Sequence, residues 1–188
     1  YIGVHAFKGC SVIASVSVSG SIANIGGGAF SECSRLKRVN ITDLNVWFDI
    51  NFTDAASNPL YYAKNLYLDN VLVTDLVVPK GLTEVKKYAF SGCSGLKSVT
   101  IPDSVTSIGN SAFYGCSGLT SINIPDSVAS VGFRSFYNCN KLKNASVPCG
   151  LDCSQAFSSV TAVNYRHNIV HHDAKAPTCT EIGWDAYD

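Results

Sequence analysis

Methionine, charge and long apolar runs are all scarce in this chain. None of its 188 residues is methionine, not even the first, so we expect a fragment of a longer precursor. Charged residues make up 15% and hydrophobic residues 46%, a composition that excludes a disordered chain. Basic and acidic residues number 14 each, so the basic excess typical of nucleic-acid binding is missing. The apolar runs are too short for a membrane-spanning helix, and we expect no membrane insertion.

A step of 23 residues organises most of the sequence. Phe90, Phe113 and Phe136 are spaced by this step, as are Phe7 and Phe30, and each follows a small residue. Cysteines lie three residues after these phenylalanines, at Cys10, Cys33, Cys93, Cys116 and Cys139. Prolines recur at the same step, at Pro79, Pro102, Pro125 and Pro148. So many positions returning at one interval indicate a repeat architecture.

The unit LKSVTIPDSVTSIGNSAFYGCSG, which begins at Leu96, shows how one repeat folds. Val99 and Ile101 alternate with polar residues, which predicts a short strand with one apolar face. Pro102 lacks an N–H and ends that strand, and Ala112-Phe113 predicts a short helical turn. Burial of an apolar side chain contributes roughly 1.5–3 kcal/mol, whereas ordering each residue costs roughly 1–2 kcal/mol. One unit therefore cannot fold alone, and we expect stacked units with a shared core.

The frame I-G-x-x-A-F-x-x-C-x-x-L-x-x-[IV]-x-I-P-x-S-V resembles the leucine-rich repeat of BspA-like bacterial surface proteins. The resemblance extends from Ile2 to about Phe157. It implies a right-handed, β-rich solenoid with a parallel sheet on its concave face and short helical turns. It also implies an exported protein, secreted or displayed on the cell surface, that takes part in adhesion. It implies no particular ligand, because repeat folds carry many functions.

We divide the chain into a leucine-rich-repeat solenoid over residues 1–163 and a non-repeat tail over residues 164–188. Phe136 and Phe157 are only 21 residues apart, which indicates a shortened terminal cap. The tail has no 23-residue frame. It is either a linker or the start of a second module that contains cysteine and histidine.

An insertion at about residues 42–75 separates Phe30 from Phe90 by 60 residues. Its crowded aromatic residues either plug the core across the break or form a binding protrusion. The apolar runs on both sides of Asp69-Asn70 resemble a β-hairpin.

The cysteines fall into groups with different expected roles. Those of the repeat are expected to be buried free thiols. Cys149 and Cys153 lie outside the frame and are compatible with a local disulfide, but their spacing does not match a redox C-x-x-C. In the tail, His171, His172 and Cys179 form an incomplete set of zinc ligands, so we predict a solvated linker and no bound metal.

Catalytic motifs are missing from the sequence. There is no G-x-S-x-G, and His5 and His167 lie far from any nucleophile motif. We therefore predict no enzymatic activity, no catalytic residues and no cofactor.

The candidate ligand-binding surface is the outer side of the predicted parallel sheet. Its residues are the outward strand positions and the lysines beside them: Lys37, Arg38, Asn40, Asp75, Lys97, Ser98, Thr100, Ser121, Asn123, Lys143 and Asn144. This surface is small, polar and mildly basic, without the aromatic and arginine anchors of tight interfaces. It is either a solvated sheet or a broad adhesive face of low affinity.

Two functions remain open at this point. The favoured one is a non-enzymatic binding or adhesion protein, at the cell surface or secreted, that recognises an extracellular protein or glycan of unknown identity. The alternative is a spacer or targeting segment attached to a separate functional domain of a larger exported protein.

Overall fold

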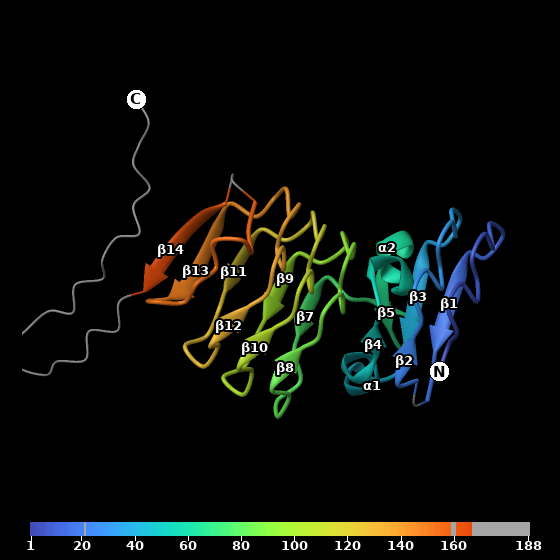
Figure 1. The fold of residues 1–188 in the computed structure, drawn as a ribbon, viewed down its shortest axis with the longest axis horizontal. Helices are drawn as coiled ribbons and strands as arrows, with labels where there is room; N and C mark the ends of the chain where they lie inside the picture. The colour runs from blue at the N-terminus through green and yellow to red at the C-terminus, as the bar shows by residue number, and fades with distance from the viewer. Residues whose placement is uncertain (21, 159–160, 167–188) are drawn as a thin grey trace, which may run out of the picture.

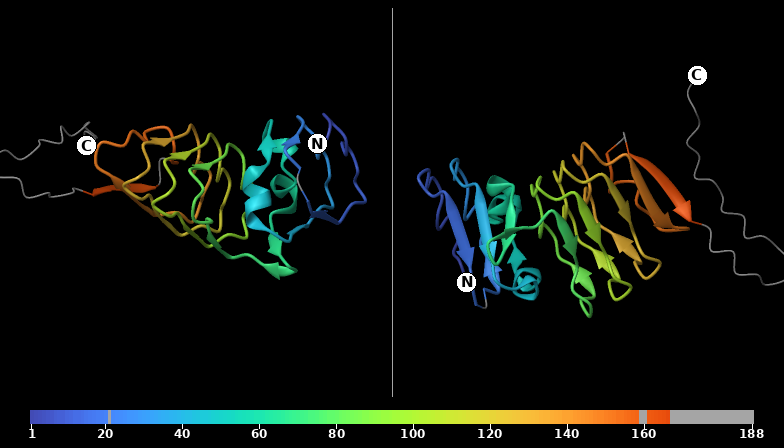
Figure 2. Two further views of the ribbon diagram at one scale, coloured as in Figure 1. Left: turned by 90° about the horizontal axis from the view of Figure 1, so that it is seen from below. Right: turned by 180° about the vertical axis from the view of Figure 1, so that it is seen from behind.

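The computed structural model describes residues 1–20, 22–158 and 161–166, and these residues form a solenoid of successive coils (Figure 1). The coils follow one another along the long axis, from the N-terminus to β14 (Ala162–Arg166) at the opposite end. Figure 2 shows the coils from below as loops around a common interior. The expected repeat solenoid of short parallel strands is therefore confirmed.

The first side of the coils carries the longer strands, and we call it the strand face. Three parallel groups make it up: β1 (Ser15–Val18), β3 (Arg38–Ile41) and β5 (Leu66–Leu68); β7 (Asp75–Val77) and β9 (Ser98–Thr100); β11 (Ser121–Asn123), β13 (Asn144–Pro148) and β14. Residues at equivalent positions of neighbouring repeats pair with each other, so Ser98 pairs with Asp75 and Asn144 pairs with Ser121. Alternate side chains such as Ile122 point into the core.

Shorter strands form a second side of the coils. They are β2 (Asn24–Ile25) with β4 (Asn51–Phe52), and β8 (Glu84–Val85), β10 (Ser107–Ile108) and β12 (Ser130–Val131). Both groups pair in parallel.

Tight turns around the repeat phenylalanines form the third side, which we call the turn face. The Cys116 N–H donates to the Phe113 carbonyl at 3.1 Å, as in a single turn of helix. The turn does not extend into a longer helix, because residues on both sides of the phenylalanine have left-handed backbones. Around Phe113 these residues are Ser111, with φ 54°, and Gly115, with φ 70°.

A ladder of stacked phenylalanine rings occupies the core behind the turn face. The ring centroids of Phe90 and Phe113 lie 5.4 Å apart, those of Phe113 and Phe136 5.2 Å, and those of Phe136 and Phe157 5.1 Å. In the same turns the Phe113 N–H donates to the Ser135 carbonyl of the next coil at 2.8 Å. Ring stacking and backbone pairing therefore repeat with the same period.

The repeat cysteines are free thiols beside this ladder, as expected. Cys33, Cys93, Cys116 and Cys139 are buried, and Cys10 in the first coil is half-buried. The Cys116 thiol donates to the Phe90 carbonyl at 3.2 Å, so it links one coil to the preceding one. Phe7 departs from the buried pattern, because it stacks on Phe30 at 5.2 Å but keeps 36% of its surface exposed.

The insertion forms a helical coil of its own between Phe30 and Phe90. It contains α1 (Leu44–Asp49), β4, the 3-10 helix η1 (Ala55–Ser57) and α2 (Leu60–Ala63). Trp47 and Phe48 are buried, and the Phe48 ring lies 5.1 Å from the Phe90 ring. The Trp47 indole N–H donates to the Ala89 carbonyl at 3.0 Å. The aromatic residues of the insertion therefore plug the core across the break in the repeat.

The expected hairpin follows this plug. β5 pairs antiparallel with β6 (Val71–Leu72). Asp69 and Asn70 between them have φ of 47° and 67°. Two left-handed residues in a two-residue loop are typical of a type I′ turn, which fits the twist of paired strands.

The sheet continues beyond residue 163, where we placed the end of the solenoid. β14 pairs in parallel with β13 up to the pair Pro148 and Arg166. His171, His172 and Cys179, which we considered as zinc ligands, lie outside the described residues. Within the described part of the chain, no helix is long and apolar enough to cross a membrane.

Phe113→Ala should destabilise the protein strongly, because its ring has no exposed surface and is stacked on both sides. We expect the free energy of unfolding to fall by about 3–5 kcal/mol, measured by denaturant titration with circular dichroism. Phe133→Ala is the matched control, because 49% of the Phe133 side chain is exposed. If Phe113→Ala lowered the free energy of unfolding no more than Phe133→Ala does, the stabilising role of the stacked phenylalanines would be contradicted.

The buried thiols should resist alkylation in the folded protein. Burial raises the pKa of Cys93 and of Cys139 to about 12, and the pKa of Cys116 well above its ordinary value. Because the thiolate is the reactive form, iodoacetamide at mildly alkaline pH should label these residues only after unfolding. Half-buried Cys10 is the internal comparison, and peptide mass spectrometry reads both states. Equal native labelling of Cys93 and Cys10 would refute the prediction.

Candidate functional site

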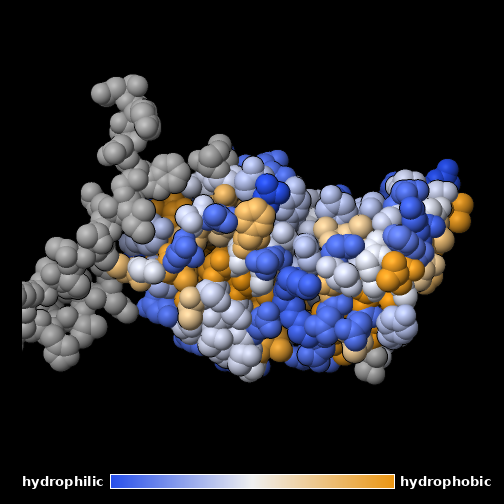
Figure 3. Space-filling view, viewed as in Figure 1, coloured by the Kyte–Doolittle hydropathy of each residue, from blue (hydrophilic) through white to orange (hydrophobic). Residues whose placement is uncertain are grey.

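The residues predicted to bind ligand all lie on the strand face or directly before one of its strands, and none is buried. Eight are exposed: Lys37, Asp75, Lys97, Thr100, Ser121, Asn123, Lys143 and Asn144. Three are half-buried: Arg38, Asn40 and Ser98. The molecular surface seen in Figure 3 mixes polar residues with scattered hydrophobic ones. The parallel register arranges the candidate residues in rows, and side-chain contacts join five of them with other residues into three clusters.

The first cluster joins β3 to the hairpin of the insertion. The Arg38 guanidinium lies 3.9 Å from the centroid of the Tyr67 ring and donates to the side-chain oxygen of Asn70 at 3.0 Å. The Asn70 N–H in turn donates to the side-chain oxygen of Asn40 at 3.0 Å. Arg38 and Asn40 therefore hold the hairpin turn against the sheet.

The second cluster is centred on Asp75 in β7. Ser98 and Thr74 both donate hydroxyl hydrogen bonds to its carboxylate, at 2.5 Å and 2.7 Å. These bonds lower the pKa of Asp75 below its ordinary value, and the bond from Ser98 has a larger effect than the bond from Thr74. The carboxylate is thus a fixed negative charge within a face that is otherwise mildly basic.

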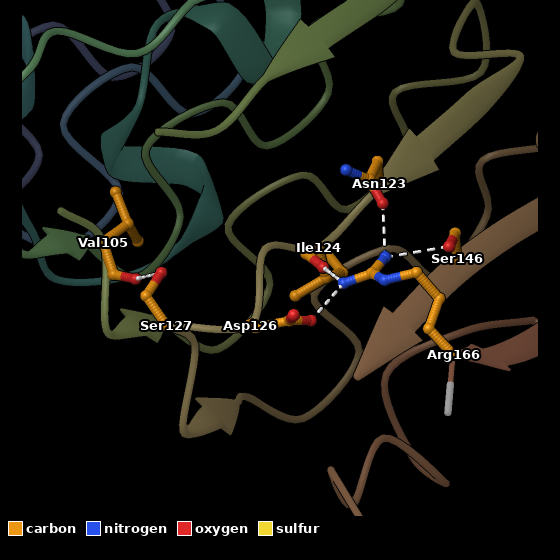
Figure 4. A network of polar contacts seen from close by, with 7 residues as sticks. All are labelled: Val105, Asn123, Ile124, Asp126, Ser127, Ser146 and Arg166. Atoms are coloured by element: carbon orange, nitrogen blue, oxygen red, sulfur yellow. Dashed lines mark hydrogen bonds and ion pairs between the residues drawn. The ribbon is translucent and has the colours of Figure 1, made fainter. Parts of the chain in front are cut away.

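The third cluster is centred on Arg166, which the sequence analysis placed in the tail (Figure 4). Its guanidinium donates to the Ile124 carbonyl at 2.5 Å, to the Asp126 carboxylate at 2.7 Å and to the Ser146 hydroxyl at 2.8 Å. It also donates to the side-chain oxygen of Asn123. Arg166 therefore clamps the last strands of the solenoid together and occupies one polar group of Asn123.

The same region contains another coil-to-coil bond. The Ser127 hydroxyl donates to the Val105 carbonyl at 2.8 Å (Figure 4). This serine belongs to the P-D-S turn of the repeat. Arg166 pairs with Pro148, so it stands where the earlier units have the repeat proline.

The local disulfide that the spacing of Cys149 and Cys153 allows is not formed. Cys149 is disulfide-bonded, but Cys153 is a free thiol whose sulfur lies 3.6 Å from the Tyr165 hydroxyl oxygen. The hydrogen bond to Cys153, together with burial, raises the pKa of Tyr165 to about 12. Tyr165 lies in β14, so this strand brings the Tyr165 hydroxyl next to the Cys153 thiol. The sequence spacing had suggested Cys149 as the partner of that thiol.

In the part of the chain that the structure describes, no group of three or more histidine, cysteine, aspartate or glutamate side chains is placed to hold a metal ion. The outward groups of the strand face are charges, amides and hydroxyls.

The family model for the BspA type leucine-rich repeat region matches residues 1–54 and 63–171 in six copies. The chain belongs to this family. The unmatched residues 55–62 lie in the insertion, where η1 and the first part of α2 replace the repeat.

Solved structures of bacterial repeat proteins resemble this BspA-type chain. A leucine-rich cell surface protein from Faecalibacterium prausnitzii is 28% identical with a TM-score of 0.48, over 78% of this chain and 42% of that protein. A leucine-rich repeat protein from Eubacterium ventriosum is 24% identical with a TM-score of 0.53, over 79% of this chain and 45% of that protein. The chain thus spans less than half the length of either protein. A comparison with curated proteins found no match.

Ser98→Ala should raise the pKa of Asp75 toward its ordinary value, because the Ser98 hydroxyl is the main cause of the lowered pKa. An NMR titration of the Asp75 carboxyl measures the change. Ser121→Ala, which alters the neighbouring strand β11, is the control and should leave Asp75 unchanged. Because the folded pKa is depressed, the stabilisation from these bonds is present at neutral pH and is lost as the pH falls through the folded pKa. An unchanged titration in Ser98→Ala would disprove the assignment.

Proposed function

We propose that this chain is a non-enzymatic binding segment of an exported bacterial surface protein, and that its strand face recognises an extracellular protein or glycan. The observation that carries the proposal is the parallel register. It sets polar side chains of successive coils beside one another, as with Asp75 and Ser98 or Ser121 and Asn144. Repeat solenoids use extended surfaces of this kind for recognition.

The chemistry of the strand face favours broad and weak contact. Its outward groups are hydroxyls, amides, one fixed carboxylate at Asp75 and lysines at the strand starts. The sheet holds these groups in place before binding, so little conformational entropy is lost on contact. A partner would therefore be held by many small polar contacts along the solenoid.

Two further observations support a binding role outside the cell. Cys149 is disulfide-bonded, and disulfides persist mainly in oxidising compartments. Membership of the BspA-type repeat family agrees with a place on the bacterial surface.

The proposal predicts saturable binding of the purified chain to at least one member of a panel of matrix proteins, mucins and polysaccharides. Alanine at Lys37, Lys97 and Lys143 together should weaken that binding about tenfold, because charges at the edge of an interface each contribute modestly. Alanine at Lys8, Lys80 and Lys141 removes the same charge from exposed positions away from the strands and is the matched control. Surface plasmon resonance measures both variants.

Equal loss of binding in both triple variants would refute recognition by the strand face. If no member of the panel binds, the chain is better explained as a spacer that carries a separate functional domain of the larger protein.

A further inference from the structure

Two adjoining hollows lie on the turn face, away from the strand face. The first has a volume of about 330 Å³ and is lined by side chains that include Tyr61, Tyr88, Tyr114 and Arg134. The second, of about 390 Å³, shares Tyr61 and Tyr114 and adds Asn138. Because they share two tyrosines, we treat them as one site and call it the tyrosine groove.

The groove lies where the residue after the repeat phenylalanine changes from serine to tyrosine. Ser91, like Ser31, holds this position, and Tyr114 and Tyr137 hold it in the next two coils. The smaller side chain leaves space beside Tyr114, and α2 of the insertion brings Tyr61 to that space. The approach is close: a Cβ atom on Gly92 would lie 2.7 Å from the Tyr61 Cα.

Ser91 also carries an unsatisfied polar group beneath the groove. It is fully buried in the chain, it lines the first hollow, and its hydroxyl oxygen has no hydrogen-bond partner among the described residues. A buried hydroxyl without a partner is costly and unusual in a folded protein. The hydroxyl is itself buried, so it lies beneath the groove, and among the described residues Ser135 has an unpaired buried hydroxyl of the same kind outside the groove.

Cations held on aromatic rings surround the groove. The Lys64 ammonium lies 5.0 Å from the Tyr61 ring centroid, and the Lys87 ammonium 6.0 Å from that of Tyr88. The Arg134 guanidinium lies over two rings, at 4.9 Å and 5.2 Å from the centroids of Phe133 and Tyr137. Among the described residues, no aspartate or glutamate lines either hollow. The groove therefore complements a negatively charged ligand.

The side chains that line the groove suit a peptide. The Tyr114 and Tyr137 rings stack on each other, with centroids 6.3 Å apart and planes 13° apart. The Asn138 side chain donates to the Tyr114 hydroxyl at 2.8 Å and fixes its orientation. Fixed tyrosines beside serine, glycine, asparagine and arginine are typical of surfaces that bind proteins.

We propose that the tyrosine groove binds an acidic segment of a partner protein. Carboxylates of the segment face Lys64 and Arg134, and an apolar or aromatic side chain fills the space that Ser91 leaves beside Tyr114. The site is separate from the strand face, so this inference and the proposed function can fail independently.

The test uses fluorescence anisotropy with a labelled short peptide of alternating glutamate and tyrosine. A peptide with lysine in place of glutamate and an oligomer of galacturonic acid serve as comparison probes. Arg134→Asn removes the guanidinium at a residue with φ 53°, a conformation that asparagine tolerates well. Arg35→Asn is the matched control, because Arg35 is exposed and lies in the second coil, outside the groove. Tyr114→Ala is a second variant, with circular dichroism to check its fold.

We expect saturable binding of the acidic peptide that weakens as salt is added. Arg134→Asn and Tyr114→Ala should each weaken this binding at least about tenfold. Arg35→Asn and the triple alanine variant of Lys37, Lys97 and Lys143 should not change it. The inference is overturned if the acidic and basic peptides bind equally, if Arg134→Asn has no effect, if no peptide binds, or if only the galacturonic acid oligomer binds.

Discussion

The stacking of one phenylalanine on the next sets the geometry of this solenoid. Each ring of the ladder from Phe90 to Phe157 lies between 5.1 Å and 5.4 Å from its neighbour, and the backbone hydrogen bonds between turns have the same period. The sheet register, the row of thiols and the order of the exposed residues therefore all follow from one contact repeated along the axis.

The repeat is also why much of the fold could be predicted from the sequence. A fixed step identified the buried Phe113 and Cys116, and alternation identified Val99 and Ile101 as inward residues. The type I′ hairpin was predictable because Asp69-Asn70 favours left-handed backbones locally. The Arg166 clamp and the free thiol of Cys153 were not predictable. They depend on where β14 lies in the shortened last unit, and a period cannot supply contacts in a unit that breaks it.

The insertion shows how one segment can serve the core and the surface together. Trp47 and Phe48 fill the interior where the repeat is interrupted, so the coils stay in contact on both sides. The insertion then continues into α2, which places Tyr61 against Gly92. From the sequence alone, the aromatic residues of the insertion were either a plug of the core or a binding protrusion. The structure places the aromatic residues of α1 in the core and a tyrosine of α2 at the groove.

A regular array cannot produce a selective site from its regular positions, because equivalent residues on every coil give a uniform surface. The strand face approaches that uniformity and suits broad contact, with local variation at Arg38, Asp75 and Arg166. On the turn face the variation is larger, since the position after the repeat phenylalanine changes from Ser91 to Tyr114 beside α2. Space and charge then occur at one place in the solenoid. Selectivity in such a protein should therefore be sought where the repeat is broken, and stability where it is kept.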